Sequence, residues 1–298
     1  MIKKILLFYY KKHMKLAQKH PKLWEYRIIA SYLGRMKTFV LSQCKSDFIK
    51  LDGISFSLPE NEILHLTLFE HEGLETKIVK KIVKEGENAL VLGANIGYWT
   101  CLLAKIVGES GKVFTFEPSP TNFEYLKKNV EANGYKNVIL EPKAVADKSF
   151  HTKLYLSEGG SMDNRIYDSH MYKTTVDVDV VKIDDYFQNS ELQFDFIKMN
   201  IQGADFAAIE GMDLLLKKSP NAKLIVEFAP EMSKGFGTDP NKFIDNMVEK
   251  DYNFYELWWY EKKIKPISIE KLKFFVEKNI NTNLICIKKN SDTKLSFI

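Results

Sequence analysis

Residues 89–100 read ALVLGANIGYWT, and this stretch decides how the rest of the chain is interpreted. Residues 89–92 form a short apolar run with the length of a buried strand, and a helix is predicted to begin near Tyr98. Between them, Gly93 and Gly97 permit backbone angles that residues with a Cβ resist, so a ligand can approach the main chain closely. A helix that begins there also presents N–H groups and the positive end of its dipole to the space above the turn. The stretch is therefore a candidate ligand-binding turn.

The next strand-like run ends in an acidic residue at an informative distance. Residues 112–116 read KVFTF and are followed by Glu117-Pro118, so Glu117 comes 117 − 93 = 24 positions after Gly93. Nucleotide-binding α/β sheets place a carboxylate on the ribose diol at about this spacing. A carboxylate accepts two hydroxyl hydrogen bonds in one plane. We therefore favour a ribose-binding role for Glu117 over that of an exposed strand-end acid.

Composition limits the class of protein. The chain has 298 residues with 45% hydrophobic content, enough for one large core. Its three cysteines, Cys44, Cys101 and Cys286, are far apart, which argues against a disulfide framework and against a metal site. No run approaches the roughly 18 apolar residues that a membrane span needs. We expect a cytoplasmic protein without a metal.

The N-terminal segment carries most of the positive charge. Residues 1–37 hold ten Lys or Arg against one acid, Glu25, which gives +9, whereas the whole chain is +4 and the remainder therefore about −5. We predict a basic helical extension over residues 1–45 and a catalytic domain over residues 46–298. The extension is interpreted either as a peripheral membrane-surface contact through residues 1–37 or as a docking helix with a solvated lysine face, and the second is favoured. Broad binding to nucleic acid is disfavoured because the remainder is acidic.

Strands and helices alternate after residue 88. A helix over residues 98–107 follows the glycine turn, Ser119-Pro120 is predicted to open a second helix as its N-cap and first residue, and a third strand unit runs from residue 137 toward Asp147. This alternation favours a parallel sheet with helices on both faces, and such sheets bind ligands beyond the carboxyl ends of their strands. Gly93, Glu117 and Asp147 each end one strand unit, so we expect them to converge on one crevice.

The rest of the chain supplies further predicted elements. The sequence indicates a hairpin around Asp52-Gly53 and helices over residues 62–68, 72–83 and 241–250. It indicates β segments over residues 150–156 and 175–181, and the loop between them (157–173) is expected to lie over the pocket. Further strands are predicted over residues 194–200 and 223–228, with a closing strand pair over 253–260 and 282–288.

Five stretches in a fixed order carry a family resemblance: ETKIVKKIVKEGENALVLGANIGYWT, VFTFEPSPTNFEYLKKNVEANG, KAVAD, FDFIKMNIQGAD and IVEFAP. Together they resemble the FkbM-type branch of the class I S-adenosylmethionine-dependent methyltransferases. The resemblance implies a Rossmann-like, mostly parallel sheet of seven strands whose last strand is antiparallel. It also implies S-adenosylmethionine as cofactor and O-methylation of a hydroxyl on a glycan, lipid head group or small metabolite.

The resemblance also assigns site residues. Gly93, Asn95 and Gly97 would line the methionine end of the cofactor, Glu117 would hold the ribose, and Asp147 would lie near the adenine amino group. The full predicted cofactor-binding set is Gly93, Ala94, Asn95, Gly97, Tyr98, Glu117, Pro118, Asp147 and Asn200, and the predicted catalytic set is Glu227, Asn200 and Gln202.

The chain departs from the family pattern where a base is often found. Val91 replaces a common aspartate, Asn200 and Gln202 stand at positions that usually carry acids, and Ala229 replaces a frequent histidine. Amides orient a hydroxyl but cannot take its proton near neutral pH. The candidate bases are therefore Glu227, which is preferred because it ends a strand beside the crevice, and Asp205, Asp163, His151 and His170.

Three other functions compete with that of a methyltransferase. The departures would also suit a cofactor-binding but catalytically silent interaction protein. A nicotinamide dehydrogenase is weakened because the turn reads GANIG rather than GxGxxG. A nucleic-acid amino-methyltransferase is disfavoured because the fourth-strand site reads MNIQG rather than Asn/Asp-Pro-Pro-aromatic.

Overall fold

The structure is a computed structural model that describes residues 9, 12, 32, 49–59, 73–157, 163–258, 263–293 and 295. The chain divides into two compact units, Met1–His71 and Glu72–Ile298. In the first unit, β1 (Ile49–Leu51) and β2 (Ile54–Phe56) pair antiparallel, which confirms the hairpin predicted around Asp52-Gly53. The predicted extension over residues 1–45, apart from residues 9, 12 and 32, and the helix predicted over 62–68 lie outside the described residues.

The second unit is built on a sheet of eight described strands. Their order is β12 (Lys263–Pro266), β11 (Tyr252–Trp258), β13 (Thr282–Lys288), β10 (Lys223–Phe228), β9 (Phe196–Met199), β3 (Ala89–Leu92), β4 (Val113–Phe116) and β5 (Val138–Glu141). Strands β5, β4, β3, β9 and β10 are mutually parallel. Strand β13 is antiparallel to both β10 and β11, so β11 runs in the parallel direction. The predicted seven-stranded sheet with a reversed last strand is confirmed, and β12 extends its edge.

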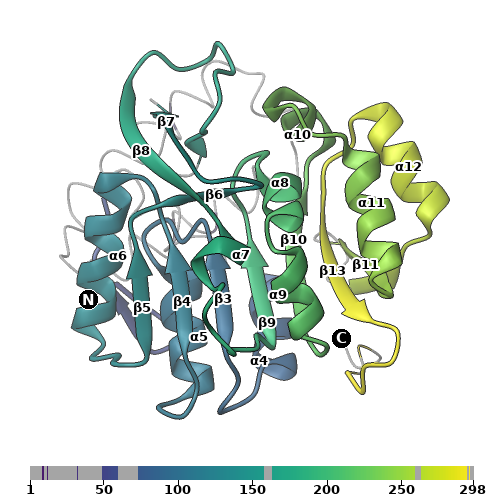
Figure 1. Cartoon of the computed structure of the whole chain (residues 1–298). Coiled ribbons are helices and arrows are strands. Elements are labelled where there is room, and N and C mark those ends of the chain that lie inside the picture. The colour runs from purple at the N-terminus through teal and green to yellow at the C-terminus, as the bar shows by residue number, and fades with distance from the viewer. Residues whose placement is uncertain are drawn as a thin grey trace. The chain divides into compact units, whose positions relative to one another are not determined.

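Helices cover both faces of this sheet (Figure 1). They are α4 (Gly73–Ile82), α5 (Tyr98–Val107), α6 (Pro120–Ala132), α7 (Ile183–Tyr186), α8 (Asp205–Glu210), α9 (Asp213–Lys218), α10 (Pro230–Phe236), α11 (Pro240–Glu249) and α12 (Ile269–Lys278). The predicted start of α6 is confirmed, because the Ser119 side chain accepts a hydrogen bond from the Asn122 N–H and Pro120 is the first helical residue. Helix α5 ends as predicted at Gly108, whose φ is 66°.

The central strands are mostly apolar because both faces of the sheet are covered. Leu90, Leu92, Ile197 and Val226 are fully buried. One buried polar residue among them is Lys198 in β9, whose Nζ lies 3.1 Å from Oε2 of the buried Glu75 in α4. A buried cation of this kind requires such a partner, so β9 and α4 are joined by an ion pair inside the core.

A second, three-stranded sheet contains β6 (Ala144–Ala146), β8 (Thr175–Lys182) and β7 (Phe150–Tyr155) in that order. Figure 1 shows the parallel strands of the main sheet pointing toward it. The prediction of one strand unit from residue 137 to Asp147 is wrong, because β5 ends at Glu141 and β6 pairs with β8 instead. The break falls at Pro142, which has no N–H to continue the β4–β5 ladder.

In the part of the chain that the structure describes, none of the helices has the length and apolar character needed to cross a lipid bilayer.

Candidate functional site

The turn after β3 is fixed by its two glycines. Gly93 has a φ of 81°, and a Cβ there would lie 2.2 Å from the Asn200 carbonyl oxygen. Gly97 has a φ of 96°, and a Cβ would lie 2.7 Å from Leu126 Cδ1. The N–H groups of Gly93 and Ala94 both donate to the Phe116 carbonyl, at 3.0 and 3.1 Å. These two N–H groups therefore join β3 to β4 rather than facing a ligand.

Glu117 lies against this turn, as the sequence predicts. Its Oε2 accepts a 2.7 Å hydrogen bond from the Asn95 N–H, and its Oε1 accepts from the Ser119 N–H at 3.0 Å and from Asn122 Nδ2 at 3.3 Å. The residue is 5% exposed. Burial raises the pKa of Glu117 to about 7, although these three hydrogen bonds oppose the rise. A carboxylate oxygen can accept two hydrogen bonds, so Oε2 retains capacity for a ligand hydroxyl.

A cleft of about 540 Å³ opens beside Glu117. Its lining combines apolar and polar residues from the ends of β3, β4 and β9, the segments that follow them, and the second sheet with its β7–β8 loop: Gly93, Asn95, Phe116, Glu117, Pro118, Asn122, Lys143, Ala144, Val145, Leu154, Asn164, Ile166, Asn200, Ile201, Gln202 and Ala204. Apolar walls with a few convergent polar groups are typical of small-molecule sites, and this one lies at the carboxyl ends of parallel strands.

Eight of the nine predicted cofactor residues lie at the cleft or in the turn beside it. Gly93, Asn95, Glu117, Pro118 and Asn200 line the cleft. Three others belong to the turn without lining the cleft: Ala94, Gly97 and Tyr98 are buried, and the Tyr98 hydroxyl lies 2.8 Å from Thr76 Oγ1 in α4.

Asp147 is the predicted site residue that the structure places elsewhere. It follows β6 and lines a different pocket, together with Lys148, Glu210 and Lys242. The place in the cleft that was predicted for Asp147 is lined instead by Lys143, Ala144 and Val145. The expected convergence of Gly93, Glu117 and Asp147 on one crevice is therefore wrong for Asp147. The physical reason is the break after β5, which directs the chain into the second sheet.

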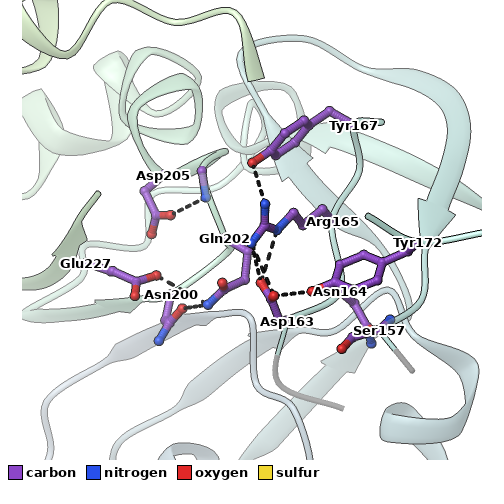
Figure 2. A network of polar contacts seen from close by, with 11 residues as sticks. Ser157, Asp163, Asn164, Arg165, Tyr167, Tyr172, Asn200, Gln202, Asp205 and Glu227 are labelled. Atoms are coloured by element: carbon purple, nitrogen blue, oxygen red, sulfur yellow. Dashed lines mark hydrogen bonds and ion pairs between the residues drawn. The ribbon is translucent and has the colours of Figure 1, made fainter. Parts of the chain in front are cut away.

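The three predicted catalytic residues form one hydrogen-bonded chain (Figure 2). Gln202 Nε2 donates to Asn200 Oδ1 at 2.6 Å and to Glu227 Oε2 at 3.3 Å. Gln202 has a φ of 53°, a left-handed conformation that is uncommon outside glycine. Asn200 and Gln202 line the cleft, so the chain connects the cleft to the carboxylate at the end of β10.

Two carboxylates at this chain have raised pKa values, namely Asp205, which is buried, and Glu227, which is partly buried and belongs to the chain itself. Asp205 accepts hydrogen bonds at 3.3 Å from the N–H groups of Ile201 and Gly203, and so holds the turn after β9. Burial, followed by the charge of Glu227, raises the pKa of Asp205 to about 7. Burial also raises the pKa of Glu227, while the nearby Lys198 charge opposes it. A carboxyl group with a raised pKa beside a cleft is suited to proton transfer near neutral pH.

The loop between β7 and β8 supplies residues that the sequence analysis missed. Arg165 is 8% exposed and donates to Asp163 Oδ1 from Nε at 3.0 Å and from Nη2 at 2.9 Å. Its Nη1 donates to the Tyr167 hydroxyl at 3.3 Å, and the Tyr172 hydroxyl donates to Asp163 Oδ2 (Figure 2). Asn164, next to this pair, lines the cleft, which supports the expectation that the loop lies over the pocket. A lone arginine in a polar stretch has no periodic signal, although its acidic neighbour two residues earlier could have indicated the pair.

The remaining candidate bases have other surroundings. Asp163 is held by Arg165. His151 Nδ1 lies 2.9 Å from Asp179 Oδ1 on the exposed side of the second sheet, and His170 is exposed beside Asp168. Neither histidine lines the cleft. Among the described residues, no group of three or more His, Cys, Asp or Glu side chains is arranged to hold a metal ion.

Comparison with known proteins places these features in a family. The family model described as the methyltransferase FkbM domain matches residues 92–254, which is more than half of the chain. The chain is 38% identical over 100 residues to a protein-L-isoaspartate O-methyltransferase from Methanococcus maripaludis, covering 33% of this chain and 40% of that protein. It is 37% identical over 79 residues to protein-L-isoaspartate O-methyltransferase 1 from Archaeoglobus fulgidus, covering 24% and 37%. These matches thus span about two fifths of the length of either relative.

Solved structures that match this backbone include two methylases. A putative rRNA-methylase from Clostridium thermocellum matches with a TM-score of 0.45 and 12% identity, covering 74% of this chain and 96% of that one. The O-methyltransferase from Bacillus cereus in complex with SAH matches with a TM-score of 0.44 and 18% identity, covering 74% and 82%. It is the family match over residues 92–254, together with the order of the strands, that decides the assignment. The chain belongs to the FkbM methyltransferase family.

Proposed function

We propose that the protein is an S-adenosylmethionine-dependent O-methyltransferase whose acceptor is a neutral hydroxyl on a glycan, lipid head group or small metabolite. One observation carries the proposal. The buried carboxylate of Glu117 is held against the turn after β3, at one side of a cleft whose other side meets Asn200 and Gln202. The cleft therefore offers a hydrogen-bond acceptor for the ribose at one end. At its other end lie the polar residues Asn200 and Gln202, which together with Glu227 form the proposed reaction end.

The residues of the cleft fit the parts of this cofactor. The apolar wall formed by Phe116, Val145 and Ile166 suits a flat adenine ring. Glu117 Oε2 can accept a ribose hydroxyl hydrogen bond. Gly93 lacks a Cβ, which lets the turn after β3 pack directly against the backbone of Asn200 at the edge of the cleft. When bound, S-adenosylmethionine supplies a methyl group on a positively charged sulfur.

The charge of the reaction end favours a neutral acceptor. Asp205 and Glu227 are acidic, the charge of Asp163 is balanced by Arg165, and the charge of Lys198 is balanced by Glu75. A carboxylate, the group implied by the isoaspartate in the names of the curated relatives, would meet repulsion from these acids. A hydroxyl would instead donate a hydrogen bond to them. The site thus supports a hydroxyl acceptor over a carboxylate.

Glu227 is the proposed general base. Its Oε2 is 3.3 Å from Gln202 Nε2, and burial raises its pKa, so it binds a proton more readily than an exposed glutamate. Glu227 would take the proton of the acceptor hydroxyl, while Asn200 and Gln202 hold the oxygen in line for attack on the methyl group. Alignment of this kind supplies a large part of the rate of a displacement reaction.

The test is transfer of label from methyl-labelled S-adenosylmethionine to a panel of glycans, polyols and lipid extracts, with an isoaspartyl peptide included. The proposal expects label on a neutral hydroxyl and none on the peptide. Transfer to the peptide carboxyl would contradict the proposed acceptor class. Binding of the cofactor by calorimetry without transfer to any acceptor would favour the catalytically silent alternative, which Val91, Asn200 and Ala229 motivate.

A further inference from the structure

A buried arginine stands between two residues of the cofactor cleft. Asn164 and Ile166 line the cleft, and Arg165 lies between them in the chain. The Arg165 side chain does not line the cleft and instead reaches Asp163 and Tyr167 (Figure 2). Arginine is almost never buried to this extent without a partner, so these contacts determine where the arginine lies. They also determine how its two neighbours face the cleft.

The guanidinium of Arg165 binds in two directions. Toward Asp163, Nε donates to Oδ1 at 3.0 Å, and Nη2 donates to Oδ1 at 2.9 Å and to Oδ2 at 3.1 Å. Toward Tyr167, Nη1 donates to the hydroxyl at 3.3 Å. A planar fork of donors can satisfy both partners at once, whereas a lysine ammonium is a point charge on a flexible stem and cannot. The fork therefore fixes the backbone on both sides of Arg165.

This short segment is tied to two neighbouring elements. The N–H and the carbonyl of Arg165 pair with the carbonyl and the N–H of Tyr155 at the end of β7, at 3.0 and 2.7 Å. The Tyr167 ring packs edge-on against Phe236 in α10, with ring centroids 5.9 Å apart. A Cβ on Gly235 would lie only 3.1 Å from Tyr167 Cε2. The network thus connects one wall of the cleft to the helix that follows β10, the strand that carries the proposed base.

The charges of the pair also act on that base. Burial is the main cause of the raised pKa of Glu227; the Asp163 carboxylate adds to the rise and the Arg165 guanidinium opposes it. With both present, their effects on Glu227 have opposite signs. The other ionisable groups around Glu227 come from four elements: Lys198 in β9, Glu75 in α4, Asp205 in α8 and Glu256 in β11.

We propose that Arg165 is a positioning residue for methyl transfer, which holds Asn164 and Ile166 at the cleft and cancels the charge of Asp163 beside Glu227. The inference rests on the proposed function, in which Glu227 is the base. Arg165 acts through its neighbours, because it does not line the cleft itself. The two parts of the role are separable, since lysine keeps the charge of arginine but not its fork of donors.

The charge is tested by carboxyl ¹³C NMR of the full chain with labelled glutamate, the Glu227 signal being assigned by its loss in Glu227→Gln. Arg165→Met leaves Asp163, whose side chain is 35% exposed, without its cation. Glu227 should then titrate about 0.5 pH units or more above its wild-type position. Asp163→Asn leaves the cation without its anion and should move the titration to lower pH. General loosening of the fold would not shift the two variants in opposite directions.

Three further variants complete this titration. Arg165→Lys keeps the positive charge, so its Glu227 should titrate close to the wild type. The matched controls are Lys153→Met and Asp179→Asn, which remove exposed charges from β7 and β8 of the second sheet. Both controls should leave the Glu227 titration unchanged.

The positioning of the cleft wall is tested by calorimetry with S-adenosylhomocysteine. Arg165→Lys and Arg165→Met both lose the fork, so both should bind it roughly fivefold to tenfold more weakly, because binding must then order the segment that carries Asn164 and Ile166. Lys153→Met and Asp179→Asn should bind like the wild type. Unchanged affinity in both Arg165 variants would overturn the inference, as would a Glu227 titration that is the same in Arg165→Met, Asp163→Asn and the wild type.

Activity separates failure of this inference from failure of the proposed function. With any acceptor that takes the methyl group, the acidic limb of the kcat profile should move with the Glu227 titration, to higher pH in Arg165→Met and to lower pH in Asp163→Asn. Transfer with an unshifted titration would overturn the inference and keep the methyltransferase. Shifted titrations and weakened cofactor binding without transfer to any acceptor would overturn the proposed function and keep the effect of Arg165 on Glu227 and the cleft.

Discussion

Oε2 of Glu117 accepts a 2.7 Å hydrogen bond from the backbone N–H of Asn95, which ties the end of β4 to the turn after β3. The same carboxylate also accepts the Ser119 N–H at the start of α6. One buried side chain thus fixes the relative positions of the two strand–helix units that form the cofactor cleft. Its ionisation should therefore affect ligand binding directly.

The affinity for S-adenosylhomocysteine should increase as the pH rises from 6 to 8. The pKa of Glu117 is raised to about 7, so the carboxyl group is mostly protonated below that pH and ionised above it. An ionised oxygen accepts a ribose hydroxyl more strongly than a neutral one. Calorimetric titration at several pH values measures the effect, and S-adenosylhomocysteine is used because its sulfur is uncharged.

Glu117→Gln should remove this pH dependence and weaken binding by roughly tenfold or more at pH 8. The matched control is Glu124→Gln, an exposed glutamate on α6, which should keep the pH dependence of the wild type. A Glu117→Gln protein that binds S-adenosylhomocysteine with an unchanged pH profile would contradict a role for this carboxylate.

Gly93→Ala should destabilise the fold strongly. The new Cβ would lie 2.2 Å from the Asn200 carbonyl oxygen, and φ at this position is 81°. The backbone strain alone costs about 1–2 kcal/mol, and the contact with a main-chain oxygen adds to it. Urea unfolding should show a loss of about 3 kcal/mol or more.

Gly134→Ala is the matched control for this substitution. Gly134 has a φ of 71°, but no atom lies within 4 Å of the position that its Cβ would take. Only the backbone strain remains, so a loss of about 1–2 kcal/mol is expected. Equal losses in the two variants would show that the close approach to Asn200 has no energetic weight.

Glu227→Gln should lower kcat by roughly 10²–10⁴ while leaving the affinity for S-adenosylhomocysteine within about twofold. The amide cannot accept the hydroxyl proton. In the wild type, kcat should fall as the pH is lowered through the pKa of Glu227, which burial raises above the ordinary 4.5, because the protonated carboxyl is no longer a base. Glu231→Gln, an exposed glutamate on α10, serves as control. Full activity in Glu227→Gln would assign the proton to another group.

Lys198→Met should cost about 3–5 kcal/mol of stability, because it leaves the carboxylate of Glu75 buried beside an apolar side chain. The comparison is Lys218→Met, which removes the exposed Lys218–Glu191 pair at 3.8 Å and should change stability by less than about 1 kcal/mol. Denaturant unfolding measures both. Similar small losses would mean that water reaches Glu75 readily in the variant.

Local sequence signals were sufficient to predict the turn after β3, the start of α6 and the position of Glu117 beside them. The two glycines around Asn95 and the Ser119-Pro120 cap determine their conformations through residues nearby in the sequence, and the structure has both as predicted. Glu117 could be predicted because it follows directly on a strand. The chain order of these elements also fixes which edge of the sheet they share.

Other parts depend on contacts that no local pattern contains. Asp147 was misplaced because Pro142 ends one ladder and β6 finds its partner in β8, where Ala144 pairs with Val180. Arg165 depends on Asp163 and Tyr167 for its position, and none of these has a periodic neighbour. Helix α12 was not predicted, although its local signals are present: the N-cap Ser268 accepts from the Lys271 N–H, and Leu272, Phe275 and Val276 form its buried stripe.

The most direct test of the account is a crystal structure of the protein with S-adenosylhomocysteine. We predict the ribose hydroxyls within hydrogen-bond distance of Glu117, the adenine against Phe116 and Val145, and the sulfur facing Asn200. A nucleoside bound elsewhere, or a Glu117 carboxylate turned away from the turn that carries Asn95, would contradict it.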